Sequence, residues 1–195
     1  MSPTPVFVIT GPSGAGKGTL IHGLVERLDV LEVAVSATTR PLRPGEQDGR
    51  EYWFLSAAEF ERRVEAGELL EHVEFVGGRY GTLASEIDRI AERGRVGVLE
   101  LEIAGALDVQ ERLPGAVTVF IAADVPELER RLRDRATESA GEIEDRIRLA
   151  RWQLEQAHRF RYMVRNDDRA RATEVLAAIV ERELELAGVG TMTGR

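Results

Sequence analysis

The sequence has 195 residues, a formal net charge of −8 and no cysteine. Its length suits one compact unit with room for inserted subdomains, and the lack of cysteine excludes a disulfide framework and a thiolate metal site. The acidic balance argues against broad nucleic-acid binding. No apolar stretch is long enough for a membrane span and no signal-peptide pattern is present, so we expect a cytoplasmic protein that contacts neither nucleic acid nor membrane.

The first predicted elements are a strand, a glycine-rich loop and a helix. Residues 5–10, PVFVIT, read as a short buried strand, and the apolar positions of KGTLIHGLVERL have helical spacing. The loop between them, GPSGAGKGT, matches the phosphate-binding pattern G-x-x-x-x-G-K-[ST] except at Gly18. This context favours a nucleotide site over a glycine-rich turn without a ligand. The predicted ATP-binding residues are Gly11, Pro12, Ser13, Gly14, Ala15, Gly16, Lys17, Gly18 and Thr19.

Lys17 is the single lysine among 26 lysine and arginine residues. A compact ammonium therefore occurs only at the position that reaches the β and γ phosphates. Gly18 stands where the pattern places a hydroxyl for magnesium. Because Mg²⁺ readily keeps water ligands, we expect it to arrive with ATP, and we assign no metal-binding residue to the protein. A contribution from Thr19 or Glu100 stays open.

A second strand is predicted at 30–36, and a segment of different character follows it. Arg40 and Arg43 lie three apart in the proline-restrained stretch SATTRPLRPGEQDGREYWF. Two guanidinium groups at this spacing can clamp a phosphate dianion, and Tyr52 and Tyr80 can add hydroxyl donors. The pattern alone leaves a second interpretation open, a solvated arginine-rich loop.

The rest of this region predicts a small, partly β insert. Ser56 fits the N-cap of a short helix, with Glu59 closing a capping box and Gly67 ending the helix. The stretch LLEHVEFVGGRYGT then reads as a hairpin that turns at Gly77 and Gly78.

Strands and helices alternate along the remainder of the chain. Strands are predicted at 96–102, 116–122 and 162–166, and helices at 84–93, 104–112, 126–136, 142–160 and 171–187. This alternation predicts an α/β fold in which helices cover both faces of a parallel sheet. The predicted division is a P-loop core (1–36, 84–125 and 161–187), an insert (37–83), a helical lid (126–160) and a disordered tail (188–195).

Five segments, in chain order, resemble the motifs of the guanylate kinase family: GPSGAGKGT, SATTRPLRPGEQDGREYWF, LLEHVEFVGGRYGT, VLELEIAGA and RNDD. The resemblance covers residues 5–185, and T-T-R-x-x-R-x-G-E-x-x-G-x-x-Y is its most specific part. It implies that the insert binds GMP and that residues 126–160 close as a lid. The implied reaction is phosphoryl transfer from ATP to GMP, and also to dGMP, in purine nucleotide metabolism.

The resemblance also implies roles for individual residues. The GMP phosphate would be held by Arg40, Arg43, Tyr52 and Tyr80, and the guanine side by Ser36, Glu71, Thr82 and Glu102, with Glu46 in the same pocket. The catalytic cations would be Lys17 and the lid residues Arg131, Arg135 and Arg146, and Asn166 would touch the adenine of ATP.

Glu71 illustrates why these residue types suit the substrate. Guanine presents N1–H and its N2 amine as adjacent donors that one carboxylate can accept together, whereas adenine offers no such pair. Without the resemblance, Glu71 also reads as a solvated charge on an edge strand, and Arg131 as the partner of Glu127 in an ordinary i,i+4 ion pair. The chain departs from the family pattern D-x-D-x-x-G, because Glu100 and Glu102 replace the aspartates and reach one methylene further.

Two other functions share part of these patterns. Ribose bisphosphate kinases share the phosphate loop but do not need Glu71, and non-catalytic guanylate-kinase-like modules bind phosphopeptides but typically lose the ATP loop. Phosphoryl transfer requires alignment and positive charge rather than a histidine. We expect the insert and the lid to close over bound nucleotides about hinges at 37–50 and 137–142, and the chain to act as a monomer or homodimer.

Overall fold

The computed structural model describes residues 5–75, 77–135 and 140–190, except for a few side chains beside the gaps. A five-stranded parallel sheet forms the centre of the molecule. The strand order is β2 (Leu31–Val33), β7 (Val96–Glu100), β1 (Phe7–Thr10), β8 (Val117–Ala122) and β9 (Tyr162–Arg165). The central strand β1 pairs with both β7 and β8. Because all five strands run in parallel, the loops that follow them meet at one edge of the sheet, where ligands of such sheets bind.

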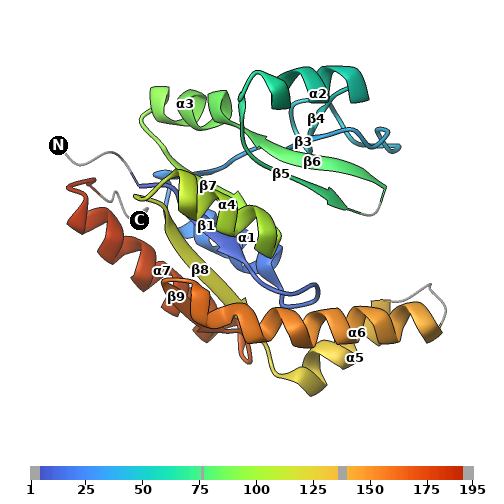
Figure 1. Cartoon of the computed structure of the whole chain (residues 1–195). Helices are drawn as coiled ribbons and strands as arrows, with labels where there is room; N and C mark the ends of the chain where they lie inside the picture. Colours follow the sequence, from blue (N-terminus) through green and yellow to red (C-terminus); the bar gives the residue numbers. More distant parts are fainter. Residues whose placement is uncertain (1–4, 76, 136–139, 191–195) are drawn as a thin grey trace.

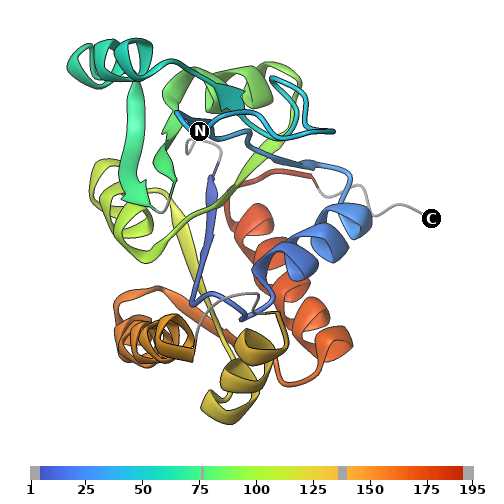
Figure 2. The same ribbon diagram turned by 90° about the vertical axis from the view of Figure 1, so that its right-hand side faces the viewer.

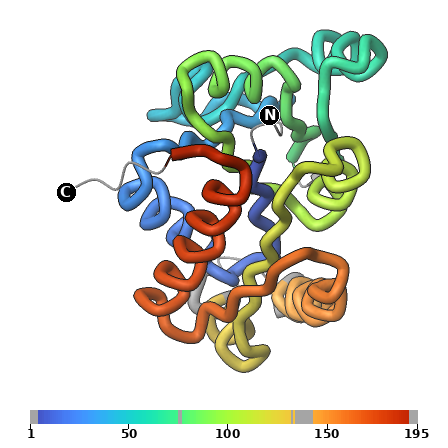
Figure 3. Tube along the Cα trace, turned by 90° about the vertical axis from the view of Figure 1, so that its left-hand side faces the viewer, coloured from blue at the N-terminus to red at the C-terminus, as the bar shows by residue number. Residues whose placement is uncertain are grey.

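Helices cover both faces of this sheet, as the alternating pattern predicts. On one face, α1 (Lys17–Arg27) and α7 (Arg169–Leu186) lie side by side over Phe7 and Ile9 (Figures 2 and 3). On the other face, α3 (Ala84–Glu92) and α4 (Ile103–Arg112) pack over Val8. Successive residues of β1 therefore enter opposite hydrophobic layers, which is the period-two alternation of a strand buried on both faces.

A second sheet contains the strands between residues 37 and 83. Its order is β4 (Trp53–Phe54), β3 (Ala37–Thr38), β6 (Gly78–Leu83) and β5 (Leu69–Phe75), with β5 and β6 forming the expected antiparallel hairpin. Helix α2 (Ala57–Glu65) packs on it through Phe60, which is fully buried. The insert thus has a small hydrophobic core of its own. Its behaviour as a separately moving unit stays a prediction.

The N-terminus of α2 differs from the expectation in one respect. Ser56 caps the helix as predicted, because its side chain accepts a hydrogen bond from the backbone N–H of Glu59 at 3.1 Å. The Glu59 carboxylate, however, accepts hydrogen bonds from Arg62 and Arg63 instead of returning to the cap. Charge-assisted bonds to two guanidinium groups are stronger than a bond to one backbone N–H, which explains the wrong capping-box prediction.

Helices α5 (Val125–Arg135) and α6 (Ala140–Glu155) form the predicted lid region, and Figure 1 shows them at the opposite end of the molecule from the insert. Ion pairs join the two helices, including Arg133 to Glu144 at 2.8 Å. The single helix predicted at 142–160 instead ends at Glu155 and continues as the 3₁₀ turn η1 (Gln156–Arg159). The predicted hinge at 137–142 lies largely outside the described residues.

The strand predicted at 30–36 is shorter than expected, with only Leu31–Val33 in β2. Ala34 still donates its N–H to the Val98 carbonyl of β7 at 2.9 Å, but Val35 donates to the carboxylate of Glu86. A side chain therefore ends the strand by taking the next backbone donor, a cause with no periodic signal in the sequence.

Two further predictions concern the C-terminal tail and membrane-spanning helices. Residues 191–195 of the predicted disordered tail lie outside the described residues. Within the described ranges, no helix combines the length and apolarity needed to cross a bilayer.

Candidate active site

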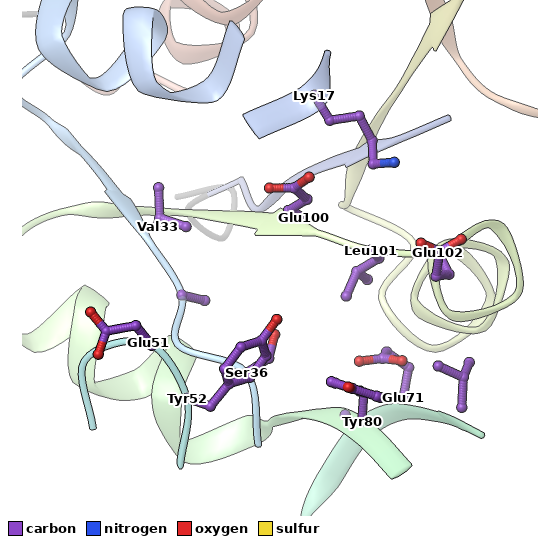
Figure 4. A pocket seen from close by; sticks show the side chains of 13 residues that line it. Lys17, Val33, Ser36, Glu51, Tyr52, Glu71, Tyr80, Glu100, Leu101 and Glu102 are labelled. Carbon is purple, nitrogen blue, oxygen red and sulfur yellow. The ribbon is translucent and has the colours of Figure 1, made fainter. Parts of the chain in front are cut away.

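A cleft of about 430 Å³ opens at the edge of the main sheet, between the phosphate loop and the insert. This volume is within the usual range for small-molecule sites. Figure 4 shows Lys17 and Glu100 on the core side, with Tyr52, Tyr80 and Glu71 across from them. The lining residues are Lys17, Val33, Ala34, Ser36, Glu51, Tyr52, Glu71, Val73, Tyr80, Gly81, Glu100, Leu101 and Glu102.

The phosphate loop is tightly enclosed by its neighbours. A Cβ on Gly11 would lie 2.2 Å from the carbonyl oxygen of Ile121, and Gly11 has φ 142°, so only glycine fits there without strain. Gly16 caps helix α1 in the left-handed conformation with φ 87°. The loop therefore turns directly into the positive end of α1, the geometry that favours a bound phosphate.

Lys17 and Glu100 face each other across the start of α1. The Lys17 ammonium donates to the carbonyl oxygen of Gly11 at 2.7 Å and is largely buried. The Glu100 carboxylate lies beside Gly18, 3.6 Å from the position that a Cβ would take there. Glu100 is solvent-accessible, but the cleft walls limit its hydration and raise its pKa, an effect that Lys17 opposes and Glu102 reinforces.

The lid arginines reach the outside of the loop. The Arg131 guanidinium donates to the carbonyl oxygen of Gly14 at 3.2 Å, and Arg146 donates to the Ser13 hydroxyl at 3.2 Å. Arg131 also pairs with Glu127 at 2.7 Å, so the ordinary i,i+4 ion pair and the lid contact coexist. The side chain of Arg135 lies outside the described residues, and its role stays a prediction.

Asn166 supports the loop from the end of β9. Its side-chain amide donates to the carbonyl oxygen of Ala15 at 2.7 Å, and the residue is buried. It also approaches Gly16, whose Cβ would lie 2.5 Å from the amide nitrogen. The structure thus gives Asn166 a contact with the loop backbone, and the predicted contact with adenine stays a prediction.

Glu71 is a buried carboxylate on the insert side of the cleft, with 2% of its surface exposed. The Thr82 hydroxyl donates to its Oε1 at 2.9 Å, and its Oε2 lies against the first turn of α4, where a Cβ on Gly105 would lie only 2.4 Å away. Burial raises the pKa of Glu71 to about 7; the Thr82 hydrogen bond opposes this shift and Asp108 adds to it. The alternative of a solvated edge charge is therefore wrong.

Two more predicted guanine-side residues lie at the same cleft. Glu102 is the N-cap residue of α4 but makes no side-chain cap hydrogen bond, and its carboxylate lines the cleft. Ser36 lines it from the link between β2 and β3. Glu71, Ser36 and Glu102 therefore border one space, whereas Thr82 lies behind Glu71 and supports it.

Arg40 is held in place before any ligand binds. Its guanidinium makes a double hydrogen bond to the Glu46 carboxylate, at 2.8 and 2.6 Å, and a third bond to the Pro41 carbonyl oxygen at 2.9 Å. It also lies over the rings of Tyr52, at 5.0 Å, and Phe54, at 5.4 Å. These hydrogen bonds occupy both protons of Nη1 and one of Nη2, so the edge formed by Nε and Nη2 still has a proton on each nitrogen.

Glu46 therefore acts on Arg40 rather than facing the cleft directly. Hydrogen bonds from Arg40, and then from the backbone N–H of Arg43, lower the pKa of Glu46 to about 2. The ring of Tyr80 stacks edge-on against Tyr52 with 5.8 Å between ring centroids, which brings two phenol groups to one wall. Arg43 is exposed, unlike the buried Arg40, so the two residues do not form a closed clamp in this structure.

Several lining residues were not predicted from the sequence. Val33, Val73 and Leu101 supply apolar surface, and Glu51 lies next to Tyr52 within the motif. Glu51, Val73 and Leu101 lie inside motifs quoted above, but their residue types alone gave no signal of a cleft, and Val33 lies outside those motifs. Among the described residues, no cluster of three or more histidine, aspartate or glutamate side chains is arranged to hold a metal ion.

Comparisons with known proteins agree with this geometry. The family model for guanylate kinase matches residues 3–183. A guanylate kinase of Desulfitobacterium hafniense is 41% identical over 91% of this chain and 90% of its own length, and one of Deinococcus radiodurans is 44% identical over 91% and 75%. The crystal structure of guanylate kinase from Anaplasma phagocytophilum matches with a TM-score of 0.73 at 26% identity, covering 92% of this chain and 86% of that one.

A more distant likeness concerns the fold alone. Shikimate kinase from Bacteroides thetaiotaomicron matches with a TM-score of 0.51 at 18% identity, over 91% of this chain and 98% of that one. The predicted α/β P-loop fold is thus confirmed, and it is shared by kinases with different acceptors, so the acceptor must be argued from the site.

Proposed function

The chain belongs to the guanylate kinase family, and on that premise we propose that it transfers the terminal phosphoryl group of ATP to GMP, giving ADP and GDP. One observation supports this proposal most strongly. A single cleft carries Lys17 and the phosphate loop on one wall and a buried carboxylate, Glu71, with two tyrosines on the other. A phosphate donor and a purine acceptor fit these opposite walls.

On the donor side, backbone N–H groups of residues 13–19 hold the ATP phosphates. In the ligand-free chain the carbonyl oxygen of Gly11 accepts the hydrogen bond of Lys17, and a β or γ phosphate oxygen replaces it as the stronger acceptor. Arg131 and Arg146 already touch the loop, so a small movement of the lid brings them to the transferred group. Asn166 keeps the loop backbone in place.

Mg²⁺ fits this wall as a companion of ATP rather than as a resident ion. Gly18 has no hydroxyl to offer, but the Glu100 carboxylate lies beside it and would hold the ion through water. When bound, the ion supplies positive charge to the β and γ phosphates.

On the acceptor side, Glu71 accepts the N1–H and N2 amine of guanine, Ser36 and Glu102 complete the base site, and Thr82 holds the Glu71 carboxylate from behind. The Nε and Nη2 edge of Arg40 binds the GMP phosphate together with Arg43, Tyr52 and Tyr80. Because Glu46 and two aromatic rings already fix the Arg40 guanidinium, little side-chain entropy is lost on binding.

The reaction then needs alignment and charge. The acceptor is a phosphate oxygen that is already ionised near neutral pH, so no protein base has to remove a proton. The protein holds the two phosphates in line and closes over them to exclude water. A closing insert and lid would bring the two walls together.

The direct experiment measures ADP release by the purified protein with Mg²⁺ and ATP against GMP, dGMP, AMP and sugar phosphates. We expect turnover with GMP and dGMP and little with the others. Preferred turnover of a sugar phosphate would identify a different small-molecule kinase. Binding of GMP without any ADP release would identify a non-catalytic module.

A further inference from the structure

The chain crosses between core and insert at two adjacent places. It enters the insert through residues 34–36, after β2, and leaves it at the end of β6, where α3 begins at Ala84 (Figure 1). Helix α3 belongs to the core, because Ile90 is fully buried in the layer over β7 and a Cβ on Gly97 would lie 3.1 Å from the Ile87 side chain. The first turn of α3 is therefore a fixed point from which the insert extends.

Glu86, in that first turn, binds both sides of the crossing. Its Oε1 accepts the backbone N–H of Val35 at 2.9 Å, in the entering link. Its Oε2 accepts the indole N–H of Trp53 at 3.3 Å, in strand β4 of the insert. One carboxylate thus joins the core helix, the entering chain and the insert sheet.

Arg89 extends these contacts to the far edge of the main sheet. It donates from Nε to Glu86 Oε2 at 2.9 Å and also pairs with Glu32 of β2 at 3.2 Å. Glu86 is 2% exposed, and burial alone would raise its pKa. Hydrogen bonds from Arg89, the Val35 N–H and Trp53 outweigh burial and lower the pKa of Glu86, so the carboxylate stays ionised and fully bonded.

We propose that Glu86 is a positioning residue for the acceptor nucleotide, because its contacts with Val35, Trp53 and Arg89 fix the insert, and with it Arg40 and Glu71, relative to Lys17. These contacts form the Glu86 clasp, which lies where the chain crosses between core and insert, at residues 34–36 and 83–86. The hinge expected at 37–50 stays a prediction. The inference rests on the proposed function.

The insert supplies a matched control. Glu59 also lies in the first turn of its helix and also pairs with an arginine three residues later, Arg62, as Glu86 pairs with Arg89. The described contacts of the Glu59 carboxylate lie within the insert. Loss of a carboxylate at either place weakens a helix terminus, but of the two only loss of Glu86 also removes a link between the insert and the core.

The kinetic test compares Glu86→Ala with Glu59→Ala after the unaltered chain has been shown to make GDP. We expect Glu86→Ala to raise KM for GMP about tenfold or more while KM for ATP changes by less than about twofold, because misplacement of about 1 Å is costly at a reacting centre. Glu59→Ala should leave both constants near those of the unaltered chain. Equal changes in both KM values for Glu86→Ala, or the same GMP effect in Glu59→Ala, would overturn the proposal.

A spectroscopic test reports on the ligand-free chain and needs no turnover. The chain has two tryptophans, and Trp152→Phe in the lid leaves Trp53 as the sole reporter. In that background Glu86→Ala should shift the Trp53 emission, and Glu86→Gln, which keeps a hydrogen-bond acceptor, should shift it less. In a separate binding measurement, Glu86→Gln should retain most of the GMP affinity that Glu86→Ala loses. Unchanged emission in Glu86→Ala would overturn the clasp.

If Glu86→Ala does not fold, Arg89→Ala provides the decisive variant, because it keeps the carboxylate but disconnects it from Glu32. We expect KM for GMP to rise about threefold with KM for ATP unchanged. No change in KM for GMP would then overturn the proposal. Failure of the unaltered chain to make GDP would instead overturn the proposed function.

Discussion

The two walls of the cleft are built in different ways. The donor wall is the phosphate loop, consecutive residues 11–19, from which Lys17 lines the cleft. The acceptor wall draws single side chains from β5, β6, the links before and after β3, and the start of α4. On the proposed function, the donor wall would bind ATP through one local segment, whereas the acceptor wall would depend on the placement of the whole insert.

The two walls also differ in how their charged groups are held. On the donor wall, cations rest on backbone carbonyl oxygens that a phosphate can readily replace. On the acceptor wall, Glu71 is buried and its pKa is raised. The positive charge of Arg40 is balanced by the carboxylate of Glu46, with which it forms an ion pair. A buried carboxylate costs stability in the free protein and recovers that cost only when a matching donor pair binds. On the proposed function, the acceptor wall would therefore discriminate between acceptors and the donor wall would supply the charge for phosphoryl transfer.

The largest expected effect is on kcat and comes from a substitution at the donor wall. Lys17→Met removes the ammonium nearest the transferred group, and we expect kcat to fall about 10³-fold, as for the loss of one strong transition-state contact. GMP affinity measured by calorimetry should stay within about twofold, because no acceptor contact changes. A variant that keeps full phosphoryl transfer would contradict the assignment of Lys17.

At the acceptor wall, Glu71→Gln keeps the Oε1 that Thr82 contacts but replaces one guanine acceptor by a donor. We expect KM for GMP to rise about 100-fold, since two hydrogen bonds to a charged group are lost or weakened, with KM for ATP unchanged. The raised pKa of Glu71 means that its ionised form destabilises the native state. At pH 8 the ligand-free variant should therefore be more stable to urea by roughly 1–3 kcal/mol. Lower stability would contradict the buried charge.

The pH dependence of KM for GMP provides a further test of Glu71. Because the pKa of Glu71 is about 7 in the free protein, its acid form predominates below pH 7, and only the ionised form accepts both guanine donors. KM for GMP should rise as the pH falls from 8 to 6, by about tenfold over the two units and with the steeper part, about fivefold, between pH 7 and pH 6. Glu71→Gln serves as the control, because the phosphate of GMP titrates equally with both proteins. Parallel profiles for the two proteins would remove Glu71 as the cause.

The smallest expected effect concerns the support of Arg40. Glu46→Gln keeps the shape of the side chain but loses one arm of the double hydrogen bond and its charge. The Arg40 guanidinium then has more freedom, and we expect KM for GMP to rise about three- to tenfold with little change in kcat. The measurement is steady-state kinetics at varied GMP. An effect on KM for ATP of the same size would indicate a wider disturbance than the loss of one support.

The sequence predicts the two walls to different extents. The phosphate loop could be located by local spacing alone, because consecutive residues 11–19 make the site. The α/β order followed from alternating strand and helix patterns, and Ser56 was correctly predicted as a cap. Glu71 could be named only through the family resemblance, because nothing in its local pattern distinguishes a buried carboxylate from a solvated one.

Contacts between distant residues account for what could not be predicted. The side chain of Asn166 donates to the carbonyl oxygen of Ala15, 151 positions away in the sequence. Glu86 accepts the backbone N–H of Val35, 51 positions away, and this contact ends strand β2 earlier than its apolar pattern indicated. Glu46 pairs with Arg40 inside an irregular loop, where no period relates the two positions. Such pairings depend on tertiary structure, which overrides local preference.

The most direct test of the division between the walls is a competition between two acceptors. Labelled GMP and AMP at equal concentration, incubated with Mg²⁺, ATP and the purified chain, give the ratio of kcat/KM for the two acceptors from the initial rates of labelled GDP and ADP formation. We predict a preference for GMP of about 10³-fold or more, since adenine leaves the Glu71 carboxylate without its paired donors. Comparable rates of labelled GDP and ADP formation would contradict it.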